Sequence, residues 1–245
     1  MTLVRYESKD HVATITMDRA EKHNALNNAL CDELREAWLR FRDGDDRVAI
    51  LASCEDAYFC VGADVKDFPA NMWHAVPGLS VELHKPVIAA TSGWVVGGGV
   101  VLVQMADLCV ASETTRFSYP EAKIGTTGGG ISSIVSRMPH KIAMEFLLVG
   151  EELSVERAYQ IGFVNSITPK GQHLAQAQEM AAKIAGNAPL VVQALKKLAR
   201  DSMPKGPLET VAEARRILDP IRGSADLKEG VAAFREKRKP NFTGK

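Results

Sequence analysis

The chain has 245 residues, and its 30 lysine and arginine residues balance 30 aspartate and glutamate residues, so the formal net charge is zero. Hydrophobic residues make up 46% and charged residues 24%, which is ordinary for a globular protein. This balance argues against a protein that binds nucleic acid or a membrane surface along an extended face, because such proteins carry a basic excess.

The first half of the chain alternates strand and helix patterns. Residues 11–17 alternate β-branched and apolar side chains, which predicts a strand. Residues 24–41 place Leu30, Leu34, Trp38 and Phe41 on one helical face, with Asn24 or Asn27 as the N-cap. Short apolar runs at 48–52, 86–90 and 108–111 are typical of strands buried under helices. We therefore expect a mixed α/β fold through about residue 120.

The remainder of the chain is dominated by helical periodicity. Helices are expected at 141–149, 154–160, 174–185, 190–200, 208–218 and 227–238. These patterns divide the chain into a core, residues 1–188, and a helical region, residues 189–245, that packs on the core or on a neighbouring subunit. Residues 228–245 carry six basic and two acidic side chains, a local basic excess.

The four cysteines, Cys31, Cys54, Cys60 and Cys109, form no CxxC pair and lie at no zinc-binding spacing. We interpret them as apolar side chains in a reducing compartment, and we predict no metal site. The N-terminus lacks the pattern of a signal or transit peptide, and no apolar run is long enough to span a membrane. These features predict a cytoplasmic protein.

A triple glycine at 97–99 follows one strand pattern and precedes an apolar helix. Such a segment lets a ligand approach the backbone, and the free N–H groups of the helix start favour an anion or an oxyanion. A tight turn with no ligand explains the glycines equally well. Neither the Walker A pattern nor the G-x-G-x-x-G fingerprint is present, so nucleotide binding has no support.

Glu121 follows Pro120 and precedes a second glycine-rich stretch, residues 125–130. A carboxylate that lines a cavity with thin glycine walls is suited to general acid/base chemistry. Without other support, a glutamate after proline is more often a solvated turn residue.

Several segments taken together resemble the crotonase superfamily, which comprises enoyl-CoA hydratases and isomerases. They occur in the family's order and spacing and cover essentially the whole chain: residues 19–27, GADVKDF at 62–68, 85–99, 106–107, 117–121 and 234–242. The resemblance implies a spiral of ββα units that binds acyl-CoA, with a C-terminal helical trimerisation region. It further implies a homotrimer or a hexamer, and no cofactor beyond the coenzyme A of the substrate.

The resemblance also assigns roles to individual residues. Backbone N–H groups of Ala63 and Gly98 are expected to hold the thioester oxygen, and Glu121 to act as the general acid/base. Lys66 and Lys237 match positions that approach the CoA phosphates, Lys237 from an adjacent subunit. The remaining expected substrate-binding residues are Ala25, Gly62, His74, Gly97, Val101, Tyr119 and Gly129.

Val101 departs from the family pattern, because typical family hydratases carry a second glutamate two residues after the triple glycine. Valine cannot transfer a proton, whereas a double-bond shift from 3-enoyl-CoA to 2-enoyl-CoA needs only one base. Val101 therefore favours isomerisation over two-glutamate hydration.

Two alternatives stay open. The loop before residue 84 is shorter than in typical hydratases and carries His74, which either packs as half of an aromatic pair or serves as a second acid/base. In the latter case the protein is a hydrolase or lyase that cleaves a β-dicarbonyl C–C bond. The other alternative is a non-catalytic CoA-binding or RNA-binding protein, and the zero net charge weakens its RNA version.

Overall fold

A computed structural model describes residues 2–245 and contains two sheets. The larger sheet has six strands in the order β1-β2-β3-β5-β7-β10. Strands β1 and β2 are antiparallel, and all other pairs are parallel. The bounds are β1 Val4–Lys9, β2 Val12–Met17, β3 Val48–Ser53, β5 Val87–Thr91, β7 Leu108–Ser112 and β10 Ser166–Thr168.

The smaller sheet stands beside the larger one and has the order β4-β6-β8-β9. Its strands are β4 Tyr58–Cys60, β6 Trp94–Val96, β8 Arg116–Ser118 and β9 Leu153–Ser154. The chain passes from a strand of the large sheet to a strand of the small sheet and then into a helix, first as β5-β6-α2 and then as β7-β8-α3. This repeat confirms the predicted α/β fold built from ββα units.

The helices follow the predicted positions closely. Asn27, not Asn24, caps α1: its side-chain oxygen accepts a hydrogen bond from the Leu30 N–H at 3.0 Å. The helices are α1 Asn28–Asp43, α2 Gly98–Met105, α3 Glu121–Ile124, α4 His140–Leu148, α5 Val155–Gln160, α6 His173–Ala185, α7 Pro189–Asp201, α8 Pro207–Gly223 and α9 Ala225–Glu236. Three 3-10 helices are η1 Ala20–Lys22, η2 Met72–His74 and η3 Gly129–Ser136.

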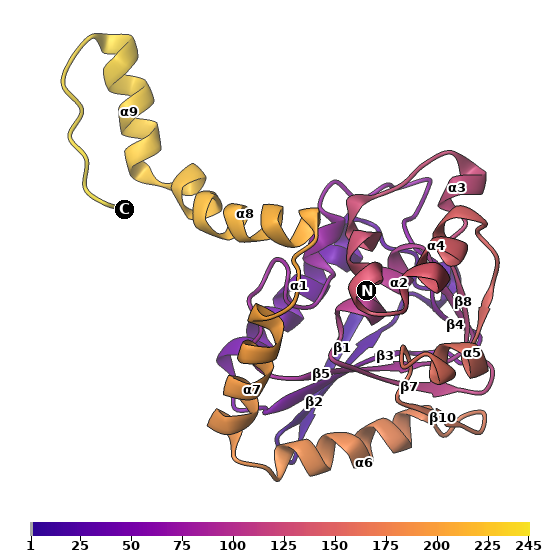
Figure 1. The fold of residues 1–245 in the computed structure, drawn as a ribbon. Helices are drawn as coiled ribbons and strands as arrows, with labels where there is room; N and C mark the ends of the chain where they lie inside the picture. Colours follow the sequence, from indigo (N-terminus) through magenta and orange to yellow (C-terminus); the bar gives the residue numbers. More distant parts are fainter. Residues whose placement is uncertain (1) are drawn as a thin grey trace.

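The large sheet is buried on both faces. Along β3, Ala49 and Leu51 face the main core, whereas Val48 and Ile50 face a second apolar cluster. Successive side chains of a strand point to opposite faces, so this strand reads as a continuous apolar run. Helix α6 covers the second cluster with Ala177, Ala181 and Ala185, and Figure 1 shows it along the sheet.

The C-terminal region divides into a packed part and a projecting part. Helix α7 lies on the body, where Lys196 Nζ is 2.6 Å from Asp107 Oδ2. The start of α8 is tied to η3 by the hydrogen bond that Ser133 Oγ donates to Glu209 Oε2 at 2.6 Å. The end of α8 and all of α9 project from the body as an arm (Figure 1). Exposed apolar side chains on this arm are Ile217, Leu218, Ile221, Leu227, Val231, Phe234 and Phe242.

Within residues 2–245, no helix is both long enough and apolar enough to cross a bilayer, and no group of histidine, cysteine and acidic side chains is arranged to hold a metal ion. Cys31, Cys60 and Cys109 are buried, and burial raises the pKa of each thiol to about 12. Thiols with such pKa values are poor nucleophiles at neutral pH.

Candidate active site

Two glycine loops pack against each other where β4 and β6 end. Gly62 and Gly97 have φ angles of 91° and 54°, in the region that favours glycine. A Cβ atom on Gly62 would lie 3.2 Å from the Gly98 nitrogen, so a side chain at this position would push the loops apart. Glycine at both positions therefore allows the two loop backbones to approach each other closely.

The residue after each glycine offers a backbone N–H. The Leu26 N–H donates to Gly62 O at 2.7 Å and Leu26 O accepts from the Asp64 N–H at 2.8 Å, a parallel bridge that turns the Ala63 N–H to the opposite side. Gly98 is the first residue of α2, whose N–H has no partner within the helix. Within residues 2–245, neither N–H has a hydrogen-bond acceptor. The pair has the character of an oxyanion hole.

Glu121 brings a carboxylate to this loop pair. It opens α3 directly after β8 and Pro120, and its Oε1 lies 2.6 Å from the position that a Cβ on Gly97 would take. Its Oε2 is buried without a hydrogen-bond partner in the described chain. Burial raises the pKa of Glu121 above the ordinary value for glutamate. A carboxylate with this environment is a suitable proton acceptor near neutral pH.

Tyr119 supports the glycine-rich wall beyond Glu121. Its hydroxyl lies 3.0 Å from Thr127 Oγ1, and the ring is buried. Ser132 Oγ donates to the Gly129 carbonyl at 2.8 Å within the first turn of η3, which continues the wall. Tyr119 thus positions the wall, and Gly129 contributes backbone to it.

An ion pair holds the loop that carries Ala63. The Arg19 Nη1 donates to Asp64 Oδ2 and to the Ala25 carbonyl, both at 2.8 Å. The Arg19 guanidinium keeps the pKa of Asp64 below its ordinary value, and Asp64 Oδ1 also accepts from the Lys66 N–H at 3.0 Å. The Lys66 side chain is exposed beside this loop.

A cavity of 230 Å³ lies near the glycine loops, and Met72 stands between it and Gly98; Ala63, Gly98 and Glu121 do not line it. Val101 is 3% exposed and forms part of its wall, and the Met72 sulfur lies 3.3 Å from the position of a Cβ on Gly98. The lining residues are Ala70, Met72, Trp73, Val76, Val101, Gly128, Gly129, Gly130, Leu208, Val211, Ala212 and Arg215. A larger cavity of 530 Å³ lies between α7 and the body, but none of the predicted site residues lines it.

Two predicted residues lie away from this centre. His74 Nδ1 is 2.8 Å from Asp32 Oδ1 of α1, and the histidine does not line the cavity. Lys237 follows α9 on the arm. There the chain after α9 folds back on the helix through an ion pair between Arg238 Nη1 and Glu229 Oε1, which are 2.6 Å apart. Within one chain, the fold does not bring Lys237 to Glu121.

The sequence profile of the family described as Enoyl-CoA hydratase/isomerase matches residues 7–245. The chain belongs to this family. An (E)-benzylidenesuccinyl-CoA hydratase of Thauera aromatica is 35% identical over 98% of the chain and 99% of that protein. Two solved structures each cover 100% of both chains with a TM-score of 0.78: a probable enoyl-CoA hydratase/isomerase from Mycobacterium abscessus, 38% identical, and a carnitinyl-CoA hydratase from Mycobacterium avium, 32% identical.

Family membership makes the protein an acyl-CoA enzyme, as predicted. Four residues of the candidate site were not predicted: Arg19, Asp64, Met72 and Arg215. Arg19 and Asp64 both lie within the motifs that predicted the family, and their opposite charges were the available signal. Arg215 carries no such signal, because α8 is far from the other site residues in sequence.

Proposed function

We propose that the protein transfers a proton at the α-carbon of an acyl-CoA thioester, with Glu121 as the sole acid/base and 3-enoyl-CoA as the preferred substrate class. The thioester oxygen accepts hydrogen bonds from the Ala63 and Gly98 N–H groups. These donors are backbone groups held by the packed loops, so they need little reorganisation as negative charge develops. By analogy with measured oxyanion holes, each supplies about 3 kcal/mol of transition-state stabilisation.

The proposed reaction balances without a redox partner. The Glu121 carboxylate takes the C2 proton of 3-enoyl-CoA, and the C2–H electron pair delocalises over the dienolate to the thioester oxygen. The protonated glutamate then returns the proton at C4, which leaves 2-enoyl-CoA. At the end Glu121 is again ionised, and the product has the same atoms and electrons as the substrate. The reaction therefore requires no cofactor beyond the coenzyme A of the substrate.

The buried position of Val101 carries the preference for isomerisation. Its apolar side chain forms cavity wall where typical family hydratases have a second glutamate, whereas Glu121 lies outside this wall, against Gly97. Hydration needs a group that orients and deprotonates water, whereas a double-bond shift uses one carboxylate twice.

Hydration or dehydration is the second candidate, and the relatives favour it, since they include hydratases from Thauera aromatica and Mycobacterium avium. In this case Glu121 exchanges protons with C2 and with the water or hydroxyl group in turn. His74-dependent C–C cleavage has less support, because the imidazole pairs with Asp32 of α1, with 2.8 Å between Nδ1 and Oδ1.

The charged residues near the cavity suggest how CoA binds. We propose that Lys66, exposed beside the Ala63 loop, meets a CoA phosphate as a flexible point charge. Lys237 can contribute only from a second copy whose arm reaches this site, which is consistent with a homotrimer or hexamer. The exposed apolar side chains of the arm supply surface for such an assembly.

The test compares the rates of 3-enoyl-CoA isomerisation and 2-enoyl-CoA hydration, with products resolved by mass. Wild type should isomerise faster than it hydrates, and Glu121→Gln should lose about 10²–10⁴-fold in kcat. Glu156→Gln, an exposed glutamate on α5, is the matched control and should retain activity. Faster hydration by wild type would replace the first candidate with the second. Unchanged activity in Glu121→Gln would overturn the role of this residue in both.

A further inference from the structure

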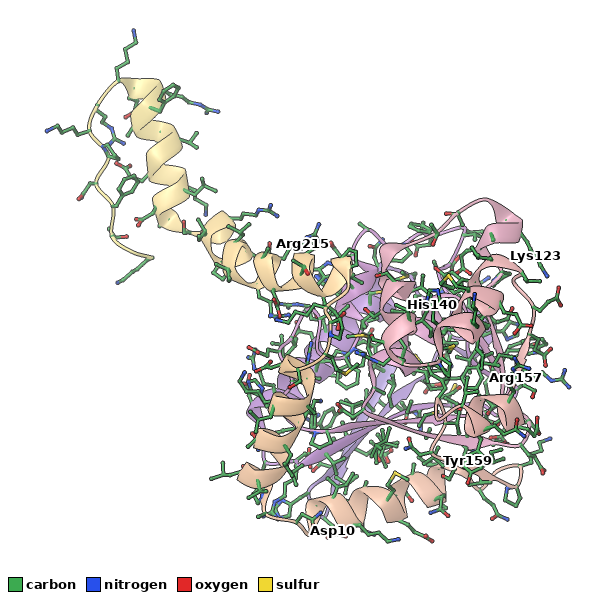
Figure 2. All side chains as sticks on the ribbon, viewed as in Figure 1. Asp10, Lys123, His140, Arg157, Tyr159 and Arg215 are labelled. Atoms are coloured by element: carbon green, nitrogen blue, oxygen red, sulfur yellow. The ribbon has the colours of Figure 1, made fainter. Side chains whose placement is uncertain are left out.

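The cavity beside the glycine loops contains a single charged side chain, Arg215 of α8. The other eleven lining residues in the described chain are apolar or glycine. Figure 2 labels Arg215 on the part of α8 that lies near the body. Arg215 is half-buried, so water hydrates part of its charge, while the apolar wall around the remainder favours a ligand that supplies an anionic partner.

The neighbouring cations of α8 differ from Arg215 because each has an oxygen partner. The Arg216 Nη1 donates to the Leu79 carbonyl at 2.5 Å, and Arg222 Nη1 lies 3.4 Å from Asp219 Oδ1. Within residues 2–245, the Arg215 guanidinium has no carboxylate within ion-pair distance and donates no hydrogen bond. Its five N–H groups are therefore available to a ligand.

Trp73 fixes the position of this guanidinium. The Arg215 Cζ lies 5.2 Å from the centroid of the Trp73 ring, within the range of a cation–π interaction. Stacking on an aromatic face orients the planar guanidinium and leaves the edges of its fork free for a planar acceptor. A carboxylate matches this geometry with two parallel hydrogen bonds.

Consecutive residues connect the guanidinium to the proposed oxyanion hole. The Met72 sulfur lies 3.3 Å from the position of a Cβ on Gly98, and Trp73, the next residue, contacts Arg215. An acyl chain with its carbonyl at Gly98 therefore passes Met72 before it reaches Arg215. The volume of 230 Å³ is below the roughly 300–1,000 Å³ of pockets that hold a whole drug-sized ligand, so the cavity suits a short acyl group.

We propose that Arg215 is a specificity-determining residue that selects acyl-CoA thioesters whose short acyl chain ends in a carboxylate. This inference rests on the proposed function, because it requires the thioester at Ala63 and Gly98. A terminal carboxylate forms a bidentate pair with the guanidinium and is screened from water by the apolar wall. A terminal methyl group instead desolvates the cation without a partner, which selects against ordinary fatty acyl chains.

The test measures binding of adipoyl-CoA and hexanoyl-CoA, two saturated thioesters of equal chain length that differ only in the terminal group. Neither contains a double bond, so calorimetric affinity does not depend on turnover. Wild type should bind adipoyl-CoA more tightly, by about 10- to 100-fold, the range expected for hydrogen bonds between charged groups. Arg215→Met, which retains an unbranched side chain over Trp73, should abolish the preference by weakening adipoyl-CoA binding, while hexanoyl-CoA binding stays the same or becomes tighter.

Two further variants separate a specific pair from general charge. Arg215→Lys should keep part of the preference, because a lysine supplies charge without the planar fork. Arg222→Met removes a cation of α8 outside the cavity and should leave both affinities unchanged. Equal binding of the two thioesters by wild type, or equal weakening of both in Arg215→Met, would overturn the inference. A clear preference without turnover of any enoyl-CoA would instead overturn only the proposed function.

Discussion

The carboxylate of Glu121 occupies the space that a side chain on Gly97 would need, with Oε1 2.6 Å from the ideal Cβ position. The acid/base group and the oxyanion loop are thus in direct contact, although 23 intervening residues form a helix and two strands between them. Gly97 has to be glycine both for its φ of 54° and for this contact. The relationship leads to separate predictions for the loop glycines.

Gly97→Ala should abolish most activity while the protein stays folded. The new Cβ displaces the Glu121 carboxylate, and a misplacement of about 1 Å can reduce the rate about 100-fold. Gly99→Ala provides the contrast, because its Cβ would collide with the Cys60 carbonyl oxygen in the packed core. That variant should lose about 1–3 kcal/mol of stability. Kinetics and thermal unfolding of both proteins check the prediction, and wild-type activity in folded Gly97→Ala would contradict it.

The pH dependence of kcat/KM should show an acid limb that belongs to Glu121. Burial raises its pKa, so the reactive carboxylate becomes protonated at a higher pH than the roughly 4.3 of an exposed glutamate. Activity should therefore fall, as pH decreases, through an apparent pKa above this value. Circular dichroism at each pH shows whether the fold persists. A flat profile down to pH 4.5 in folded protein would be inconsistent with the assignment.

Glu121→Gln should raise the melting temperature at pH 7.5 although it removes activity. A carboxyl group whose folded-state pKa is raised destabilises the native state above that pKa, where it is charged without a partner. This penalty disappears below the unfolded-state pKa, near 4.3. The gain from Gln should therefore shrink as pH falls towards 4. Paired thermal scans across this pH range test the sign, and a lower melting temperature for Glu121→Gln at pH 7.5 would refute it.

Arg19→Ala should reduce kcat/KM by about 100-fold, because it releases the segments that carry Ala25 and Ala63. Arg5→Ala is the matched control, because it breaks an ion pair of similar length, 2.9 Å between Arg5 Nε and Asp18 Oδ2. The side chains of this pair are 51% and 38% exposed. Such surface pairs contribute little. If both variants behaved alike, the Arg19–Asp64 pair would have no special role in the loop.

Periodicity predicted the long elements because each buries a regular face. Leu30, Leu34 and Trp38 recur at helical spacing, and all three are fully buried on α1. The smaller sheet gave no usable pattern, since β4, β6 and β8 have three residues each, too few for an alternation to stand out. Residues 121–124 form a short helix, whereas Pro120 had indicated only a turn.

The sequence predicted those parts of the candidate site that lie in contiguous motifs. Prediction failed for side chains whose positions are determined by tertiary packing. Glu121, Ala63 and Gly98 come together because β4, β6 and β8 are neighbours in one sheet. The direction of His74 depends on Asp32 of α1, and the place of Arg215 depends on Trp73. Neither contact is encoded by local spacing. Such long-range pairs require the folded chain.

The most direct test of the account follows exchange of the C2 protons of a saturated acyl-CoA with D2O by mass spectrometry. This reaction isolates α-proton transfer, because a saturated thioester can neither hydrate nor isomerise. Wild type should incorporate deuterium at C2, and Glu121→Gln should slow incorporation by about 10²–10⁴-fold while Glu156→Gln retains it. No exchange by wild type, or equal exchange by Glu121→Gln, would contradict proton transfer by Glu121 at the α-carbon.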